Sequence, residues 1–226
     1  MTFSIVGRCR RSGMLGVAVT TSSISVGARC PFVRAGVGAV ATQNITDPAL
    51  GPAVLDRMQA GMEAADAVGE ALNNDPNRAY RQVTAVDRHG ATAWHSGGRI
   101  LGLHNQSAAA DCVAAGNLLA DEAVTEAVAE EFDRRREHLA ERLLAAIEAG
   151  LRAGGEQGDV HSAALLVADR HPFPLVDLRV DWHDRDPVGA LRDLWHAYRP
   201  QMDAYLTRAL DPANAPAYGV PGDPCE

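Results

Sequence analysis

The chain has 226 residues, which is enough for one domain whose core buries roughly 70% of the surface that the unfolded chain exposes. With 46% hydrophobic and 22% charged residues it has the composition of a globular protein. The net charge of −8 argues against a nucleic-acid partner, because phosphate binding requires a basic face. We expect a single domain over residues 1–210 and a tail rich in proline and glycine at residues 211–226.

All basic side chains other than histidine are arginines, because the sequence contains no lysine. This excludes a Schiff-base lysine, the lysine of a phosphate loop and a Ser-x-x-Lys base. Cys9, Cys30, Cys112 and Cys225 lie far apart, and nothing resembles a signal peptide or a membrane-spanning run of roughly 20 apolar residues. We therefore expect a cytoplasmic protein with reduced thiols and no membrane partner.

Hydrophobic periodicity and turn residues predict strands and helices in alternation along the chain. Gly13 supplies a tight bend between the first two strands, and Asp47 followed by Pro48 marks a helix start. The elements expected in this part are strands at 2–8, 15–23 and 36–44, and helices from about 47 to 61 and from 63 to 74.

The rest of the chain continues this alternation and closes with a long helix. Pro200 lies inside that helix and should kink it. The expected elements are a hairpin at 80–87 and 91–96, a strand at 111–117, two helices between 121 and about 153, a hairpin at 161–170 and 174–182, and a helix over about 187–209.

The strand sequences "GVAV", "GAVA" and "AALLVA" are continuous apolar runs, which indicates that both faces of these strands are covered. Their short connections favour antiparallel pairing. Two mostly antiparallel sheets packed face to face, with helices outside each, satisfy both observations and predict an α+β, four-layer αββα sandwich. The residues expected at or near the interface of the sheets are Phe3, Ile5, Val17, Val19, Val40, Leu165 and Val167.

The loop "GGEQGD" at 154–159 is not typical of a phosphate loop, since it lacks the GK[ST] ending and follows a helix. Its glycines should let the chain cross the mouth of a cleft and bring Asp159, His161 and Ser162 near it. No two histidines stand at i,i+4 spacing with a carboxylate partner, so we expect no metal and no cofactor.

Several segments together resemble the bacterial family of unknown function numbered 1028, which is assigned an N-terminal nucleophile hydrolase-like fold. They are "TFSIV", "GVAV", "VGARCPFVRAGVGAVATQ" followed by "PALGP", "AAGN.L", "LAERLLAAIEAG" and "SAALLV", over about residues 2–185. The run 36–43 and the pair Gly116-Asn117 are the most specific parts. The resemblance implies the fold and a nucleophile at Thr2, but no substrate.

The sequence departs from the family pattern at two places. The loop before "SAALLV" usually carries Gly-Gly-Asp and then an arginine and a glutamine ahead of the serine, whereas here it reads "GGEQGDVH", with His161 ahead of Ser162. Thr20 and Thr21 follow "GVAV", where alanine and serine are usual. These changes imply an altered pocket or a drifted function.

Thr2 becomes the first residue if Met1 is removed, and it then carries a hydroxyl and a free α-amine. An α-amine has an unperturbed pKa of about 7.7–8.0, so it can serve as the base for its own side chain. Asn117 is the candidate donor to the oxyanion of the tetrahedral intermediate. Two alternatives remain, since a threonine after Met1 is common without catalysis and Gly116-Asn117 also suits a turn.

The candidate substrate-binding residues are Thr21, Gln43, Arg81, Asp159, His161 and Ser162. Gln43 ends a strand, where it either lines the pocket or satisfies backbone groups. Arg81 either clamps a substrate carboxylate or forms a structural ion pair.

Two functions from different classes follow. The first is an amidohydrolase that cleaves a small amide or cyclic amide with Thr2 as nucleophile. The alternative is a non-catalytic small-molecule-binding or metabolic sensor protein on the same fold. In either case we expect a small-molecule partner and a homo-oligomer.

Overall fold

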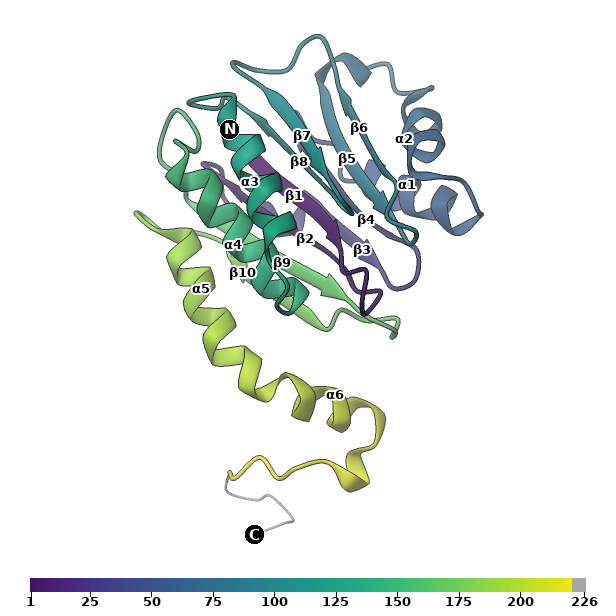
Figure 1. The fold of residues 1–226 in the computed structure, drawn as a ribbon, viewed down its shortest axis with the longest axis vertical. Coiled ribbons are helices and arrows are strands. Elements are labelled where there is room, and N and C mark those ends of the chain that lie inside the picture. The colour runs from purple at the N-terminus through teal and green to yellow at the C-terminus, as the bar shows by residue number, and fades with distance from the viewer. Residues whose placement is uncertain (221–226) are drawn as a thin grey trace.

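The computed structural model describes residues 1–220, and within this range the strands form two sheets (Figure 1). All strand pairs are antiparallel, in the orders β10-β9-β2-β1-β8-β7 and β3-β4-β5-β6. The strands are β1 (Thr2–Arg8), β2 (Leu15–Thr21), β3 (Pro31–Arg34), β4 (Gly38–Asn44), β5 (Arg81–Asp87), β6 (Thr92–Ser96), β7 (Asn105–Ala109), β8 (Cys112–Asn117), β9 (Ser162–Ala168) and β10 (Val176–Val180).

Helices cover the outer face of each sheet, so the molecule has the predicted four layers (Figure 1). One pair packs on the four-stranded sheet, and the next three pack on the six-stranded sheet. The α+β, αββα prediction is confirmed. The helices are α1 (Leu50–Gln59), α2 (Ala64–Leu72), α3 (Ala123–Arg134), α4 (Leu139–Arg152), α5 (Pro187–Tyr198) and α6 (Met202–Leu210).

The core residues divide between three layers, and our expectation for the sheet interface is wrong for most of them. Val17 does lie between the sheets, and Val19 packs beside it against Val26 and Cys30. Val40 instead faces α1 and α2. The helices α3 and α4 cover the others, which are Phe3, Ile5, Leu165 and Val167. Successive residues of a strand point to opposite faces, and both faces are apolar here, so composition alone does not show which face is which.

Two strands were not predicted. The segment β3 has only four residues, and β7 consists of small and polar residues at the edge of its sheet, so neither has a strong apolar signal. The strand expected from residue 36 begins at Gly38, because Gly36 has φ +66° in the turn that follows β3.

The last helix is interrupted where the sequence places Pro200. A 3₁₀ turn at Arg199–Gln201 separates α5 from α6, which confirms the kink. After a short 3₁₀ turn at Pro212–Asn214 the described part of the tail has no helix or strand, and Cys225 lies outside the described residues. Within residues 1–220, no helix is long and apolar enough to cross a membrane.

Candidate active site

Four polar residues form a row across the six-stranded sheet. Asn117 of β8 pairs directly with Thr2 of β1, Thr2 pairs with Thr21 of β2, and Thr21 pairs with Ser162 of β9. Directly paired residues on neighbouring strands point to the same face. Thr2 and Val6 are four residues apart in β1, so they also share a face, and Val6 lies between the sheets. The row therefore faces the four-stranded sheet. The structure thus brings these four predicted site residues together.

Met1 covers the row at its centre. The Thr2 hydroxyl donates to the Met1 carbonyl at 2.5 Å, and the Thr21 hydroxyl also bonds this carbonyl. The two hydroxyl oxygens are 3.0 Å apart. A Cβ on Gly158 would come within 3.2 Å of the Met1 methyl group, so the Met1 side chain lies against this glycine. With Met1 in place only 7% of Thr2 is exposed, and a substrate has no access to its hydroxyl.

A chain of side-chain amides links the row to the opposite sheet. The Ser4 hydroxyl donates to Gln43 Oε1 at 2.6 Å, and Gln43 Nε2 donates to Gln82 Oε1 at 2.8 Å. Asn117 Nδ2 donates to the same Gln82 oxygen at 3.1 Å. Because all four residues are buried, each bond replaces a lost contact with water and holds the two sheets in a fixed relation.

Backbone carbonyls fix which way each amide points. Gln43 Nε2 donates to the Ala115 carbonyl at 3.1 Å, and Gln82 Nε2 donates to the Gly116 carbonyl at 3.0 Å. Gln82 must therefore present its oxygen to Asn117, and Asn117 must present its nitrogen. Within residues 1–220, Asn117 Oδ1 is buried without a hydrogen-bond partner, and one N–H of the Asn117 amide group has no acceptor.

Glu156 is the most unusual side chain near the row. It is 6% exposed, and neither of its carboxylate oxygens has a hydrogen-bond partner within residues 1–220. Burial raises the pKa of Glu156 to about 8, although the nearby Met1 α-ammonium and the Ser22 N–H act to lower it. The Ser22 N–H lies near enough to the Glu156 carboxylate to lower its pKa, but it does not form a hydrogen bond with it. An unpartnered buried carboxyl is costly to the fold, so Glu156 is a candidate functional residue.

The backbone around Glu156 explains how it reaches the N-terminus. Glu156 forms a bridge with Leu119, two residues beyond Asn117, where the Gln157 N–H donates to the Leu118 carbonyl. Leu118 and Leu119 direct their own N–H groups to the segment that leads into β7. The loop at 154–158 therefore lies on the side of β8 that β1 occupies. It lies just beyond the start of β1, next to Met1.

The other predicted residues on the β9 side have structural partners. The Ser162 hydroxyl donates to the Ser23 carbonyl at 2.6 Å and accepts from the Val26 N–H at 3.1 Å. His161 is half-buried and stacks on Trp182 with ring centroids 4.4 Å apart. Asp159 is exposed on the 154–159 loop. Ser162 thus belongs to the row, while His161 and Asp159 border it.

Arg81 lies at the end of β5 in a buried ion pair. Its Nε is 2.8 Å from Asp75 Oδ2, and its Nη1 donates to the Ile45 carbonyl at 2.7 Å. The hydrogen bond from Arg81 lowers the pKa of the Asp75 carboxyl. These contacts correspond to the structural alternative for Arg81, and no contact joins it to the row.

Sequence reasoning missed Ser4, Gln82 and Glu156. Ser4 had a usable signal, because Thr2 and Ser4 alternate with Phe3 and Ile5 and so share a face. Gln82 and Glu156 had none, since their partners come from distant segments.

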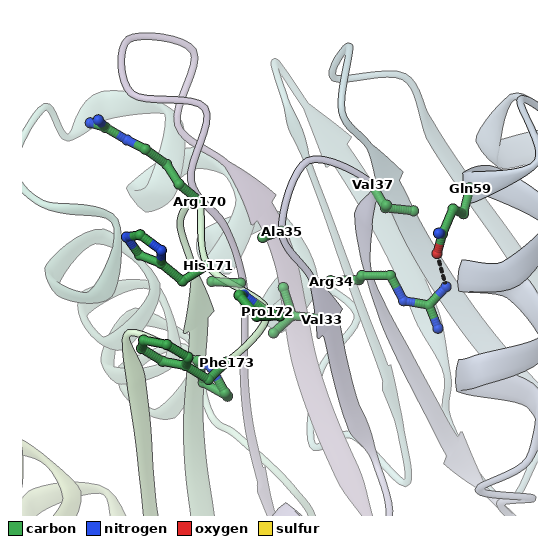
Figure 2. Close-up of a pocket in the computed structure, with 11 residues that line it drawn as sticks. Val33, Arg34, Ala35, Val37, Gln59, Arg170, His171, Pro172 and Phe173 are labelled. Carbon is green, nitrogen blue, oxygen red and sulfur yellow. Dashed lines mark hydrogen bonds between the residues drawn. The ribbon is translucent and has the colours of Figure 1, made fainter. Parts of the chain in front are cut away.

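A separate cavity of about 390 Å³ opens at the far end of β9 from Ser162. Figure 2 shows Arg34 and Gln59 on one side of it and His171 and Phe173 on the other. None of the predicted site residues lines it. Within the described residues no group of three or more His, Cys, Asp and Glu side chains is arranged to hold a metal ion.

The fold and the polar row define an αββα sandwich protein whose candidate site is built around the start of its first strand. The chain belongs to the family of unknown function DUF1028, which matches residues 2–191. The crystal structure of protein SPO2555 from Silicibacter pomeroyi, a member of this family, is similar with 33% identity and a TM-score of 0.82, over 87% of this chain and 85% of that one.

Two further solved structures match at much lower similarity. Anbu (ancestral beta-subunit) from Yersinia bercovieri has 13% identity and a TM-score of 0.40, over 89% of this chain and 96% of that one. An Anbu mutant from Hyphomicrobium sp. strain MC1 has 14% identity and a TM-score of 0.40, over 90% of this chain and 97% of that one. Comparison with curated proteins gives no match.

Proposed function

We propose that this protein is an N-terminal nucleophile hydrolase that cleaves a small amide or cyclic amide after Met1 has been removed. One observation carries the proposal: Thr2 begins β1 directly opposite Asn117, in a buried row of polar side chains. The four layers and the position of Thr2 are those that the family resemblance leads us to expect for this class of hydrolase.

The reaction uses both functional groups of an N-terminal Thr2. The neutral α-amine accepts the proton of the Thr2 hydroxyl, directly or through one water, while Oγ1 attacks the substrate carbonyl. The free N–H of Asn117 donates to the oxyanion that forms. The protonated amine then gives its proton to the leaving nitrogen, and water hydrolyses the acyl enzyme by the same route.

Glu156 is the second acceptor near this amine. Its carboxyl group and Asn117 Oδ1 are both buried and have no donor among residues 1–220, and an α-amine supplies N–H groups of the required kind. We propose that Glu156 orients the Thr2 amine and exchanges a proton with it. A coupled pair of this kind titrates as a unit.

Removal of Met1 creates the space for the substrate. Its carbonyl and side chain occupy the region between the Thr2 hydroxyl, Thr21 and Gly158. A site vacated by one methionine residue suits a small molecule, and we propose a small amide, lactam, ureide or acyl-amino acid as the substrate class.

The experiment has two stages. Intact-mass spectrometry of untagged protein first measures how much of it begins at Thr2. The Thr2-terminal form is then screened for hydrolysis of small amides, lactams, ureides and acyl-amino acids. Retention of Met1 in nearly all molecules, or ligand binding without turnover, would favour the alternative of a non-catalytic binding or sensor protein.

We also propose that the chain acts in the cytoplasm as a homo-oligomer. Apolar side chains of α5 and α6 are exposed, with Leu194 at 41%, Tyr205 at 42% and Leu210 at 52%. Burial of these side chains against a second copy would be favourable. Light scattering of the purified protein measures the mass of the assembly, and a monomer at micromolar concentration contradicts this proposal.

A further inference from the structure

A second pocket, of about 380 Å³, lies at the opposite end of β1 from Thr2. It is formed by the end of β1 and the β1–β2 turn, the β7–β8 turn, the end of α3 and the connection that follows it, and one residue of α4. Its volume falls within the range of small-molecule sites. Five arginines line it, although the whole chain carries a net charge of −8. They are Arg8, Arg10, Arg11, Arg136 and Arg142.

Two of these arginines share one carboxylate. Arg8 Nη1 is 2.8 Å from Asp111 Oδ1, and Arg10 Nη2 is 2.7 Å from Asp111 Oδ2. The backbone of Gly90 makes room for this arrangement, because a Cβ there would lie 2.0 Å from the Asp111 carboxylate. The pair of arginines and Asp111 form a fixed wall that retains one positive charge.

The other three arginines form no ion pair with a carboxylate within residues 1–220. Their side chains donate to backbone carbonyls instead. Arg11 donates to the carbonyl of Arg136, Arg136 to those of Asp133 and Arg135, and Arg142 to that of Phe132. Asp133 also lines the pocket and offers one negative charge against these three. The pocket therefore has an excess of positive charge.

Arg142 is the clearest case, because it is only 8% exposed. Its guanidinium lies 3.9 Å above the Phe132 ring and donates to the Phe132 carbonyl at 3.1 Å and 3.3 Å. Burial lowers the pKa of Arg142, because the charged form loses its hydration, and the nearby Cys9 and Cys112 thiols offset this effect only in part. Buried charges are ordinarily paired, so this position calls for an anion.

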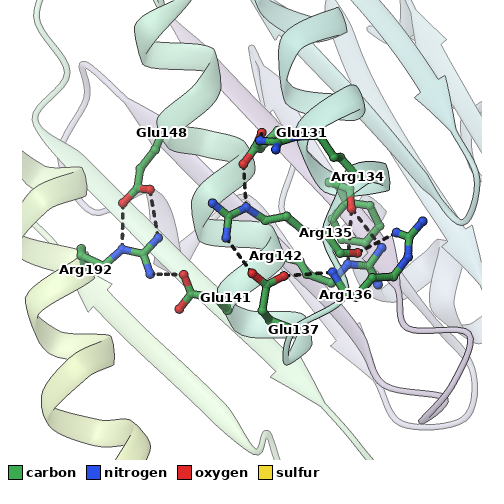
Figure 3. A network of polar contacts seen from close by, with 10 residues as sticks. Glu131, Arg134, Arg135, Arg136, Glu137, Glu141, Arg142, Glu148 and Arg192 are labelled. Atoms are coloured by element: carbon green, nitrogen blue, oxygen red, sulfur yellow. Dashed lines mark hydrogen bonds and ion pairs between the residues drawn. The ribbon is translucent and has the colours of Figure 1, made fainter.

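Two nearby arginines, Arg192 of α5 and Arg135 just after α3, do form ion pairs with carboxylates. Figure 3 shows Arg192 bound to Glu141 and Glu148, and Arg135 bound to Glu131 and Glu137. Carboxylates are thus abundant around α3 and α4. Within residues 1–220, Arg11, Arg136 and Arg142 nevertheless form no ion pair with any of them.

We propose that the pocket lined by Arg11, Arg136 and Arg142 binds a phosphate group, either free phosphate or that of a small phosphate monoester. Guanidinium groups bind phosphate oxygens through paired N–H donors, and a dianion matches the excess of positive charge. The site is separate from the row around Thr2, and the proposal does not depend on a hydrolase activity.

Cys9 offers an independent way to observe occupancy, because it lines the same pocket. Burial acts to raise the pKa of the Cys9 thiol, but hydrogen bonds from Ser12 and the nearby Arg142 outweigh it, and the net pKa is lowered. Burial raises the pKa of Cys30 and Cys112 to about 12. An alkylating probe should therefore distinguish Cys9 from these two, and bound phosphate should protect it.

The test is calorimetric titration of the full chain with inorganic phosphate and with glycerol phosphate, at constant ionic strength. Arg136→Gln and Arg142→Gln each remove one proposed donor, and we expect each to weaken binding by about 10-fold or more. Arg134→Gln is the matched control, since Arg134 lies on the same helix terminus, is 73% exposed at its side chain and bonds Glu131 outside the pocket. Its effect should stay within about 2-fold.

Peptide-level mass spectrometry of Cys9 alkylation gives the second measurement, with and without phosphate. Slower alkylation of Cys9 in the wild type, and no such protection in Arg136→Gln, supports the assignment. Arg136 is exposed, so its substitution should leave the fold intact even if Arg142→Gln does not fold. Stronger binding of glycerol phosphate identifies an ester as the ligand, and stronger binding of inorganic phosphate identifies the free ion. Absence of binding, equal weakening by Arg134→Gln, or equal binding of succinate overturns the proposal.

Discussion

Thr2 and Asn117 are directly paired residues of the adjacent antiparallel strands β1 and β8, and both are buried. The two residues are 115 positions apart in the sequence, yet their side chains emerge from one face of the sheet. Asn117 Nδ2 donates to Gln82 Oε1, and within residues 1–220 Asn117 Oδ1 has no hydrogen-bond partner. The pairing puts a hydroxyl and a side-chain amide next to each other on one face of the sheet.

Substitutions of Thr2 test whether it is the nucleophile. Thr2→Ala removes the hydroxyl and should lower hydrolysis of any substrate found by at least about 10³-fold, whereas Thr2→Ser should retain part of it. A tag that leaves residues ahead of Thr2 converts the base into an amide and should also abolish turnover. Circular dichroism checks that each form is folded. Full activity in Thr2→Ala or in the tagged protein places the nucleophile elsewhere.

Glu156→Gln should change how stability depends on pH. The pKa of Glu156 is raised to about 8 in the folded protein, so between the unfolded pKa of about 4.3 and pH 8 the folded state binds more protons than the unfolded state. The extra proton binding stabilises the folded state. This stabilisation is complete below the unfolded pKa of Glu156 and is lost as the pH rises towards 8.

Urea unfolding of the wild type and of Glu156→Gln at pH 5 and pH 8 measures this effect. The wild type should lose on the order of 2–4 kcal/mol relative to the variant between the two values. Glu148→Gln is the control, because this carboxylate is bound by Arg192. A pH dependence that is the same in wild type and Glu156→Gln shows that Glu156 ionises normally.

Gln82→Ala should destabilise the protein by about 2–4 kcal/mol, because Asn117 Nδ2 and the Gly116 carbonyl lose their buried partner. Chemical denaturation measures the free energy of unfolding. Gln59→Ala serves as control, since Gln59 is exposed and its side chain bonds the exposed part of Arg34, and its effect should remain within about 0.5 kcal/mol. Equal effects of the two substitutions would contradict the importance of the amide chain.

Two glycines in the helices that cover the smaller sheet should respond in opposite ways to alanine. A Cβ on Gly51 of α1 would lie 2.1 Å from the Phe32 ring, so Gly51→Ala should lower stability by about 1–3 kcal/mol. Nothing lies within 4 Å of a Cβ on Gly69 of α2, and Gly69→Ala should raise stability by about 0.5–1 kcal/mol. Thermal unfolding of both variants checks the two signs.

The sequence alone determined the layers of the fold. Continuous apolar strands joined by short turns admit few arrangements other than two covered antiparallel sheets, and the kink at Pro200 follows from the missing N–H of proline. The resemblance added Thr2 and Asn117 as a candidate pair. These inferences rest on local patterns, which a sequence displays directly.

Only the tertiary structure decided which face each strand residue occupies and which polar groups find partners. Phe3 and Val17 are equally apolar, and the packing of α3 and α4 placed the first outside the sheets and the second between them. Arg81 forms an ion pair with Asp75, whereas within residues 1–220 Arg142 forms no ion pair with a carboxylate and Glu156 has no hydrogen-bond partner. Burial and pairing depend on segments far apart in the chain, and a single sequence does not state which of them meet.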